Sequence, residues 1–193
     1  MNKDLTNRLV KRFPVLYQDY SSPMSQTCMC WGFDHGDGWF EIIWQLSLAI
    51  EDHLGYSSAQ KHWFIFKKGF FRKWNDLIYK ISPVARDKTK MEGTGKTGDP
   101  YRQVVIEKAR PRLPWVKKFV SWPYTGFSVQ QVKEKYGTLR FYCGGDETID
   151  KYVNLACALS EITCEVCGKP AKLDSTGGWY SVVCTPCKAQ SKK

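Results

Sequence analysis

Four cysteines near the carboxyl end of the sequence have the spacing of metal ligands. Cys164 and Cys167 form one Cys-x-x-Cys pair, and Cys184 and Cys187 form a second pair after sixteen intervening residues. Two residues between cysteines let both sulfurs bind one ion at about 2.3 Å. A redox pair would instead open a helix within a βαβ unit, a pattern that this sequence lacks. We therefore predict a structural Zn²⁺ site with four thiolate ligands, which leaves no coordination position for catalysis.

A second group of reactive side chains lies between Cys28 and Asp37. His35 could act as a base oriented by Asp34 or Asp37, as in a hydrolase, or it could bind a second metal. In the structural alternative, Asp37 caps the following helix and His35 lies in a turn, while Cys28 and Cys30 are small buried residues. We favour the structural alternative, because a chain with three histidines offers a hydrolytic centre few groups to draw on.

The glycine-rich segment GTGKTGD at 93–99 is similar to a phosphate-binding loop. A P-loop also has a glycine five positions before its Gly-Lys-Thr, and the residue at that position here is Lys90. We therefore expect a basic loop that wraps an anion, or a plain linker, rather than a site that hydrolyses nucleotides.

The positive charge of the chain is concentrated in its middle third. The net charge is +10, and residues 61–140 hold 19 basic and 6 acidic side chains. Concentrated positive charge attracts polyanions, and exposed rings stack on bases. The candidate anion-binding residues are Lys67, Lys68, Arg72, Lys73, Lys96, Arg102, Arg110, Arg112, Lys117 and Lys118. The candidate stacking residues are Trp63, Trp74, Tyr101 and Trp115. The alternative is a solvated charged surface over an aromatic core.

The sequence also bears on location. No run of 18 apolar residues occurs, so we expect no membrane span. An interfacial helix at 61–81 is a weaker alternative, because its rings are spread around the expected helix. The first residues lack the apolar stretch of a secretory signal, which predicts a reducing, cytoplasmic location. Eight cysteines there suit metal ligands or buried thiols. The roles of Cys143 and Cys157 stay open.

The first half of the chain is expected to be helical. Apolar spacing predicts a first helix over 3–13, and a second from near Asp37 to about Leu54, closed by Gly55. The polar side chains expected to face away from the core on the second helix are Glu41, Gln45, Glu51 and Asp52. Residues 58–81 should form a helix in two pieces, broken at Gly69.

The remainder combines a loop, a hairpin and a last helix. We expect a long basic loop over 82–103 and short elements among the prolines of 104–126. A hairpin is predicted around Tyr136-Gly137-Thr138. Its buried face would be formed by Val129, Val132, Leu139 and Phe141. Asp146 should cap a helix that ends near Ser160. Its inward residues would be Ile149, Tyr152, Val153, Ala156 and Leu159.

These elements predict an α+β fold, with a helical body, a small hairpin sheet and a C-terminal zinc ribbon docked on the last helix. Between the cysteine pairs, Gly177-Gly178 indicates the turn of the ribbon hairpin. The expected domains are an α+β body over 1–160, which includes a basic, aromatic-rich insert at 58–126, and the ribbon over 161–193.

Several short motifs together resemble a family of small zinc-ribbon proteins of bacteriophages and prophages. The motifs are GDGW (36–39), QVKEKYGTLRFY (131–142), CEVCG (164–168), GW (178–179) and CTPC (184–187). The resemblance covers residues 28–60 and 127–188 and leaves the basic middle as a variable insert. It implies a zinc-binding phage accessory protein that acts in the host cell, and it supplies no catalytic residue.

Three functions are compatible with these observations. The first is a non-enzymatic protein that binds nucleic acid or a small nucleotide signal, and that could serve counter-defence. The second is an inhibitor that occupies a host enzyme through protein–protein contact. The third, which we consider weaker, is a hydrolase centred on His35.

Overall fold

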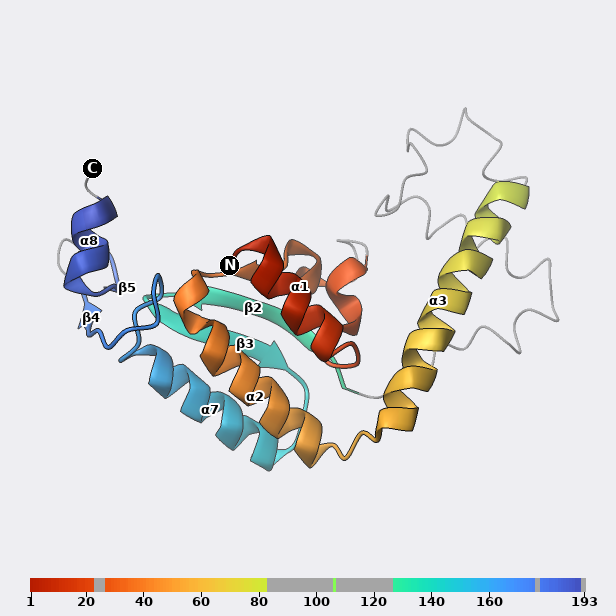
Figure 1. Cartoon of the computed structure of the whole chain (residues 1–193), viewed down its shortest axis with the longest axis horizontal. Helices are drawn as coiled ribbons and strands as arrows, with labels where there is room; N and C mark the ends of the chain where they lie inside the picture. Colours follow the sequence, from red (N-terminus) through yellow and green to blue (C-terminus); the bar gives the residue numbers. More distant parts are fainter. Residues whose placement is uncertain (23–26, 83–105, 107–126, 176–177, 192–193) are drawn as a thin grey trace.

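The computed structural model describes residues 1–22, 27–82, 106, 127–175 and 178–191, and it has an α+β fold (Figure 1). The amino-terminal elements are α1 (Lys3–Arg12), η1 (Gln18–Ser21), η2 (Cys28–Trp31), β1 (Phe33–Asp34), η3 (Asp37–Trp39), α2 (Phe40–His53) and α3 (Ser58–Ile81). The carboxyl-terminal elements are β2 (Val129–Lys135), β3 (Thr138–Cys143), α7 (Glu147–Ser160), β4 (Leu173–Asp174), β5 (Ser181–Val182) and α8 (Thr185–Ser191). The predicted fold class is confirmed.

A three-stranded sheet joins the two ends of the chain. Its order is β1-β2-β3, with β1 parallel to β2 and β2 antiparallel to β3. The turn residues Tyr136 and Gly137 have φ of 56° and 74°. Two consecutive positive φ values are the requirement of the two-residue turn that best fits strand twist. Because Phe33 pairs with Val132, the segment that leads into α2 lies beside the hairpin.

The core lies between this sheet and helices α1, α2 and α7. The hairpin contributes the four residues predicted from its alternation, and all four are buried. Trp39 and Phe13 have no exposed surface and are among the largest buried side chains. At α7, Asp146 accepts hydrogen bonds from the Thr148 and Ile149 amides, as a helix N-cap does. The core therefore forms from both sides of the basic middle segment.

One acidic residue on α2 lies inside rather than outside. Glu51 was expected to face away from the core, but it is 5% exposed. Its carboxylate accepts from Arg12 of α1 at 2.7 Å and from Lys61 of α3 at 2.6 Å. The prediction was wrong because α1 and the start of α3 cover this side of α2, so two cations replace water around the carboxylate.

Residues 58–81 form one helix rather than two. Ser57 and Gln60 make a capping box at its start. A Cβ at Gly69 would meet no atom within 4 Å, and a glycine costs a helix only about 1 kcal/mol relative to alanine. That cost is too small to interrupt a helix of 24 residues, so the predicted break is wrong.

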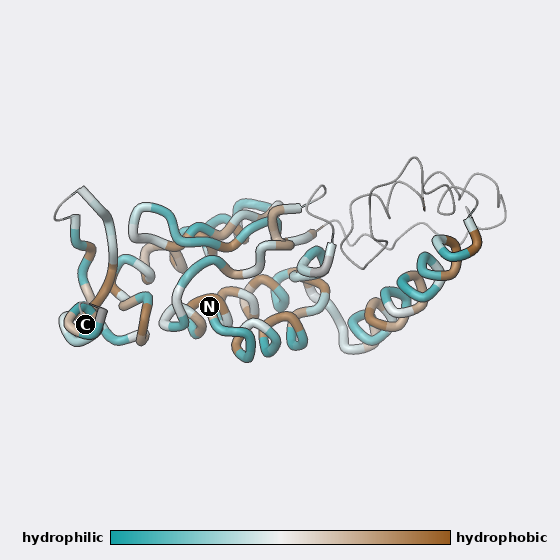
Figure 2. The backbone as a smooth tube through the Cα atoms, turned by 90° about the horizontal axis from the view of Figure 1, so that it is seen from above, coloured by the Kyte–Doolittle hydropathy of each residue, from teal (hydrophilic) through white to brown (hydrophobic). Residues whose placement is uncertain are grey.

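The rings of α3 are not spread evenly around the helix, as the sequence had suggested. Phe64, Phe71 and Ile78 recur every seven residues and are buried. The exposed apolar residues of this helix are Trp63, Ile65, Phe66, Phe70, Leu77 and Ile81. Hydrophobic and hydrophilic positions alternate along α3, which extends away from the rest of the described chain (Figure 2). Its buried and exposed apolar sides are therefore distinct.

Leu159 of α7 is a further correction. It was expected to point inward with Ile149 and Ala156, which are buried, but it is 41% exposed. Leu159 lies at the edge of the buried stripe of α7.

Within the described residues, no helix is both long enough and apolar enough to cross a membrane. The elements predicted over 83–105 and 107–126, including the loop at 93–99, lie outside the described residues.

Candidate metal centre

The four predicted ligands come together at one point. The sulfurs of Cys164, Cys167, Cys184 and Cys187 all lie within 4.8 Å of one another, and the Cys167 and Cys184 sulfurs are 3.6 Å apart. Four sulfurs at about 2.3 Å from a tetrahedral ion are roughly 3.8 Å apart. Among the described residues, no other group of three or more histidines, cysteines or carboxylates meets this test. The donor set and spacing fit a structural Zn²⁺ ion.

Short elements deliver the two cysteine pairs. The first pair lies in a tight turn, where the Gly168 amide donates to the Cys164 carbonyl at 2.9 Å and Gly168 has a φ of +76°. Between the pairs, β4 and β5 form the predicted antiparallel hairpin. The Glu165 amide donates to the Val182 carbonyl at 2.9 Å, which joins the first turn to β5. Cys184 lies two residues after the end of this strand, and α8 supplies Cys187.

Backbone amides favour the thiolate of the first ligand. Burial opposes ionisation of Cys164, but amides of Cys184, Cys167 and Val166 face its sulfur and lower its pKa to about 6. The neighbouring Cys184 and Cys167 sulfurs accept the thiol proton of Cys187 and raise the pKa of Cys187 to about 12. Four crowded thiols do not all ionise by themselves at neutral pH. A bound dication would favour the fully deprotonated set.

A loop 129 residues away holds the first cysteine turn in place. The Gly38 amide donates to the Glu165 carbonyl at 2.7 Å, and the Gly36 amide donates to the Glu165 carboxylate at 2.8 Å. The indole of Trp39 donates to the Thr163 carbonyl at 2.8 Å. The ribbon is therefore anchored to the loop before α2, as well as following the last helix of the body.

Both glycines of this loop are required by the close approach. A Cβ on Gly36 would lie 2.3 Å from the Glu165 carbonyl oxygen, and one on Gly38 would lie 2.1 Å from that of Cys164. These contacts are shorter than any real Cβ contact. This role of the two glycines was not predicted from the sequence. Two glycines before a tryptophan were a visible signal for a tight turn, but the partner of the turn was not visible.

The hydrolase hypothesis receives no support from the surroundings of His35. This residue is 6% exposed and packs edge-on to the Phe33 ring. Its Nδ1 donates to the Gly36 carbonyl at 2.7 Å, and its Nε2 is buried without a hydrogen-bond partner among the described residues. Asp34 is exposed. His35 is a core residue rather than an accessible base.

Asp37 has a different partner from the one predicted. Its carboxylate accepts from the Asn2 backbone amide at 2.6 Å and from the Asn2 side chain at 2.7 Å. The amide hydrogen bond is the main cause of a lowered Asp37 pKa. No side-chain cap is present at the start of the following helical turn. Asp37 therefore ties the loop to α1 instead of capping the next helix.

The remaining cysteines differ in exposure. Cys28 is exposed, against expectation, while the Cys30 thiol donates to the Thr27 carbonyl at 3.0 Å. Burial raises the pKa of Cys143 to about 11 and also raises the pKa of Cys157. Thiols of this kind are poor nucleophiles. These two thiols thus have the character of packing residues.

The candidate anion-binding and stacking residues fall into three groups. Lys68 is half-buried and donates to the Gln18 carbonyl at 2.9 Å, so it fixes α3 to the body. Arg72 and Lys73 are exposed, and Lys67 is half-buried. Trp63 is 57% exposed. Candidates outside the described residues are Lys96, Arg102, Arg110, Arg112, Lys117, Lys118, Tyr101 and Trp115.

The fold and the site together define an α+β protein with a C-terminal four-cysteine cluster consistent with a zinc ribbon. Comparisons of the chain with protein-family models, with curated proteins and with solved structures gave no match. The resemblance to phage zinc-ribbon proteins therefore stays a prediction.

Metal analysis tests the cluster directly. We expect one Zn²⁺ per chain, and we expect Cys184→Ser to lose it, because three thiolates hold the ion far less tightly. Cys28→Ser changes an exposed cysteine outside the cluster and should keep the full metal content. Elemental analysis of the purified proteins gives the stoichiometry. Metal binding contributes on the order of 10 kcal/mol to folding of such modules. Equal zinc in both variants would contradict the assignment.

The glycine contact makes a second prediction. Gly38→Ala should lower the free energy of unfolding by about 1–3 kcal/mol, because backbone atoms must shift to admit the methyl group. It should also weaken zinc retention against a chelator. Gly69→Ala is the matched control, and it should raise stability by up to about 1 kcal/mol. Urea titration of the three proteins measures the free energies of unfolding, and a chelator titration measures zinc retention. A Gly38→Ala protein as stable as wild type would show that the close approach is wrong.

His35 predicts a pH dependence. Burial is the largest cause of a lowered His35 pKa, which falls from 6.5 to about 4. Between these two pH values the unfolded chain binds a proton on His35 and the folded chain does not. The folded state should therefore lose about 3 kcal/mol as the pH falls from 6.5 to 4, and keep this contribution above pH 6.5. His35→Gln should lack this part of the decline. Urea titrations of both proteins across the window measure it, and a pH-independent difference between them would refute it.

Proposed function

We propose that this chain is a non-catalytic binding protein in which a zinc-loaded ribbon braces the body and α3 contacts nucleic acid. The observation that carries the proposal is the combination of exposed rings and cations on one helix. Trp63 and Phe66 stack with centroids 5.5 Å apart and planes 11° apart, and the Lys67 ammonium lies 5.0 Å from the Trp63 ring. Flat exposed rings accept bases, and nearby cations hold phosphates.

The charge distribution supports the same ligand class. Arg72 and Lys73 are exposed on α3, and the whole 61–140 segment is strongly basic. The body at residues 1–60 is acidic by comparison. A phosphate-bearing ligand would therefore be drawn toward the basic 61–140 segment, which includes most of α3, and away from residues 1–60. Single-stranded nucleic acid fits better than duplex, because stacking needs unpaired bases. A small nucleotide signal shares the required chemistry.

The resemblance to phage proteins supplies a biological setting for this proposal. Within it, the protein is a phage accessory factor that acts in the host cytoplasm, and binding of a nucleic acid or nucleotide signal would serve counter-defence. The zinc has a scaffolding role here, because four thiolates leave no coordination position for substrate.

Inhibition of a host enzyme is the second candidate. It is favoured by Trp179 of the ribbon, which is 82% exposed, and by Trp31, which is 68% exposed. Exposed tryptophans are frequent anchors of protein–protein contacts. This function predicts a partner protein that stays bound in moderate salt. Nucleic-acid binding predicts the opposite response.

A salt titration tests nucleic-acid binding. Fluorescence anisotropy with a labelled single-stranded oligonucleotide should give an affinity that falls steeply with salt. Removing two cations in Arg72→Ser/Lys73→Ser should reduce the slope of log affinity against log salt by about 1.4. Trp63→Ala should weaken binding by about 1–3 kcal/mol with the slope unchanged.

The control for net charge is Lys3→Ser/Lys11→Ser, which removes two exposed cations from α1. This variant should bind as wild type does. An equal loss in both double variants would mean that net charge, rather than α3, governs binding. The absence of any salt-dependent binding by the wild-type protein would overturn the proposal.

A further inference from the structure

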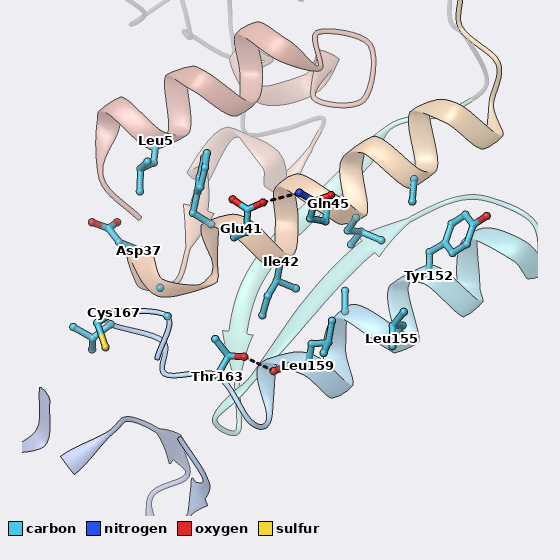
Figure 3. A pocket seen from close by; sticks show the side chains of 17 residues that line it. Leu5, Asp37, Glu41, Ile42, Gln45, Tyr152, Leu155, Leu159, Thr163 and Cys167 are labelled. Carbon is cyan, nitrogen blue, oxygen red and sulfur yellow. Dashed lines mark hydrogen bonds between the residues drawn. The ribbon is translucent and has the colours of Figure 1, made fainter. Parts of the chain in front are cut away.

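An apolar groove runs along the outer side of α2 and α7 (Figure 3). Its volume is about 840 Å³. Ile42 from α2 and Leu155 and Leu159 from α7 line it, and Val166 and Cys167 of the first cysteine turn lie at one end. Leu155 is 61% exposed. Concave, mostly apolar sites of this kind are where proteins commonly bind ligands or partner segments. We call it the α2–α7 groove.

The rim of the groove is acidic. Asp37 and Glu41 line it at the end near α1, and both are exposed. Their hydrogen-bond donors are neutral amides, from Asn2 and Gln45. The Met1 ammonium also attracts the Asp37 carboxylate, whereas Glu41 accepts from the neutral Gln45 amide. The rim therefore favours an occupant that carries cations beside an apolar face, chiefly at Glu41.

The chain itself carries a surface of this kind. Five exposed apolar residues of α3 fall within about 80° of arc around the helix, and their exposed fractions run from 46% to 63%. They are Trp63, Phe66, Phe70, Leu77 and Ile81. We call this surface the α3 stripe. The same geometry places Lys73 and Lys80 along one of its edges and Lys67 along the other.

The stripe is long enough to span the groove. From Trp63 to Ile81 it is about 27 Å long, at about 1.5 Å per residue. Helix α2, with its 14 residues, is about 21 Å long. Within one chain, α3 extends away from the body (Figure 1) and is tied there by the Lys61–Glu51 and Lys68–Gln18 contacts. In this arrangement the α3 stripe is not packed on the α2–α7 groove of the same chain, and its five residues stay 46% to 63% exposed.

We propose that the α2–α7 groove of one copy of this protein binds the α3 stripe of a second copy. Apolar anchors at helical spacing would enter the groove, as in other helix-in-groove complexes, and Lys73 or Lys80 would approach the acidic rim. The helix and the groove are different surfaces, so the contact is heterologous. It closes into a pair when each copy donates its helix to the other.

Sedimentation velocity and light scattering test this association without nucleic acid, so that the result is independent of the proposed ligand. The wild-type chain should self-associate at concentrations up to about 100 μM. Phe66→Asp on the stripe and Leu155→Asp in the groove should each weaken association at least tenfold, because each places a charge in an apolar contact. Circular dichroism should show that both variants remain folded, since both side chains are largely exposed.

Matched controls place the same new charge elsewhere. Ile65→Asp changes an exposed residue on another side of α3, and Ile162→Asp changes an exposed residue just beyond α7 that does not line the groove. Both controls should associate as wild type does. A mixture of Phe66→Asp and Leu155→Asp retains one intact helix and one intact groove, so it should form a 1:1 complex although neither variant associates alone.

Three results would overturn the proposal. These are a wild-type protein that stays monomeric, controls that weaken association as much as the test variants do, and a mixture that stays monomeric. In the last case, the helix and the groove would not be each other's partners.

Discussion

The close packing of the Gly36–Gly38 loop against the first cysteine turn is the contact on which the rest of this structure depends. It brings backbone against backbone, with the Gly38 amide 2.7 Å from the Glu165 carbonyl and no room for a side chain on either glycine. Such a contact fixes position more rigidly than side-chain packing can, because main-chain atoms have few ways to yield. The ribbon, α2 and β1 are all placed relative to it.

This contact explains several features together. It buries His35 beside the loop and aims the Trp39 indole at the Thr163 carbonyl. Through this contact, the cysteine cluster is linked to the loop before α2 as well as to its own small hairpin module. Four thiolates around one ion would lock the first turn in shape, and that turn holds the loop from which α2 starts. Metal binding in the last thirty residues would therefore stabilise the amino-terminal half of the core.

The shared core and the exposed side of α3 are separate parts of this molecule. The sheet, α1, α2 and α7 share one core, whereas α3 is attached to the body through polar contacts of Lys61 and Lys68. The exposed side of α3 carries rings and cations that the body does not use. Both proposals place a partner on Trp63 and Phe66, so nucleic acid and a second copy would compete for the exposed side of α3.

The sequence by itself determined features that depend on local spacing. Two cysteine pairs specified the ligand set, alternation specified the hairpin, and Asp146 specified the start of α7, because each signal lies within a few residues of its consequence. The tertiary structure decided what depends on distant neighbours. Glu51 is buried because two other helices bring cations to it, and Asp37 binds Asn2 because α1 returns to the loop. Gly36 and Gly38 could be recognised as turn residues from the sequence. Only the fold shows that this turn contacts Glu165, which is 129 positions after Gly36 in the chain.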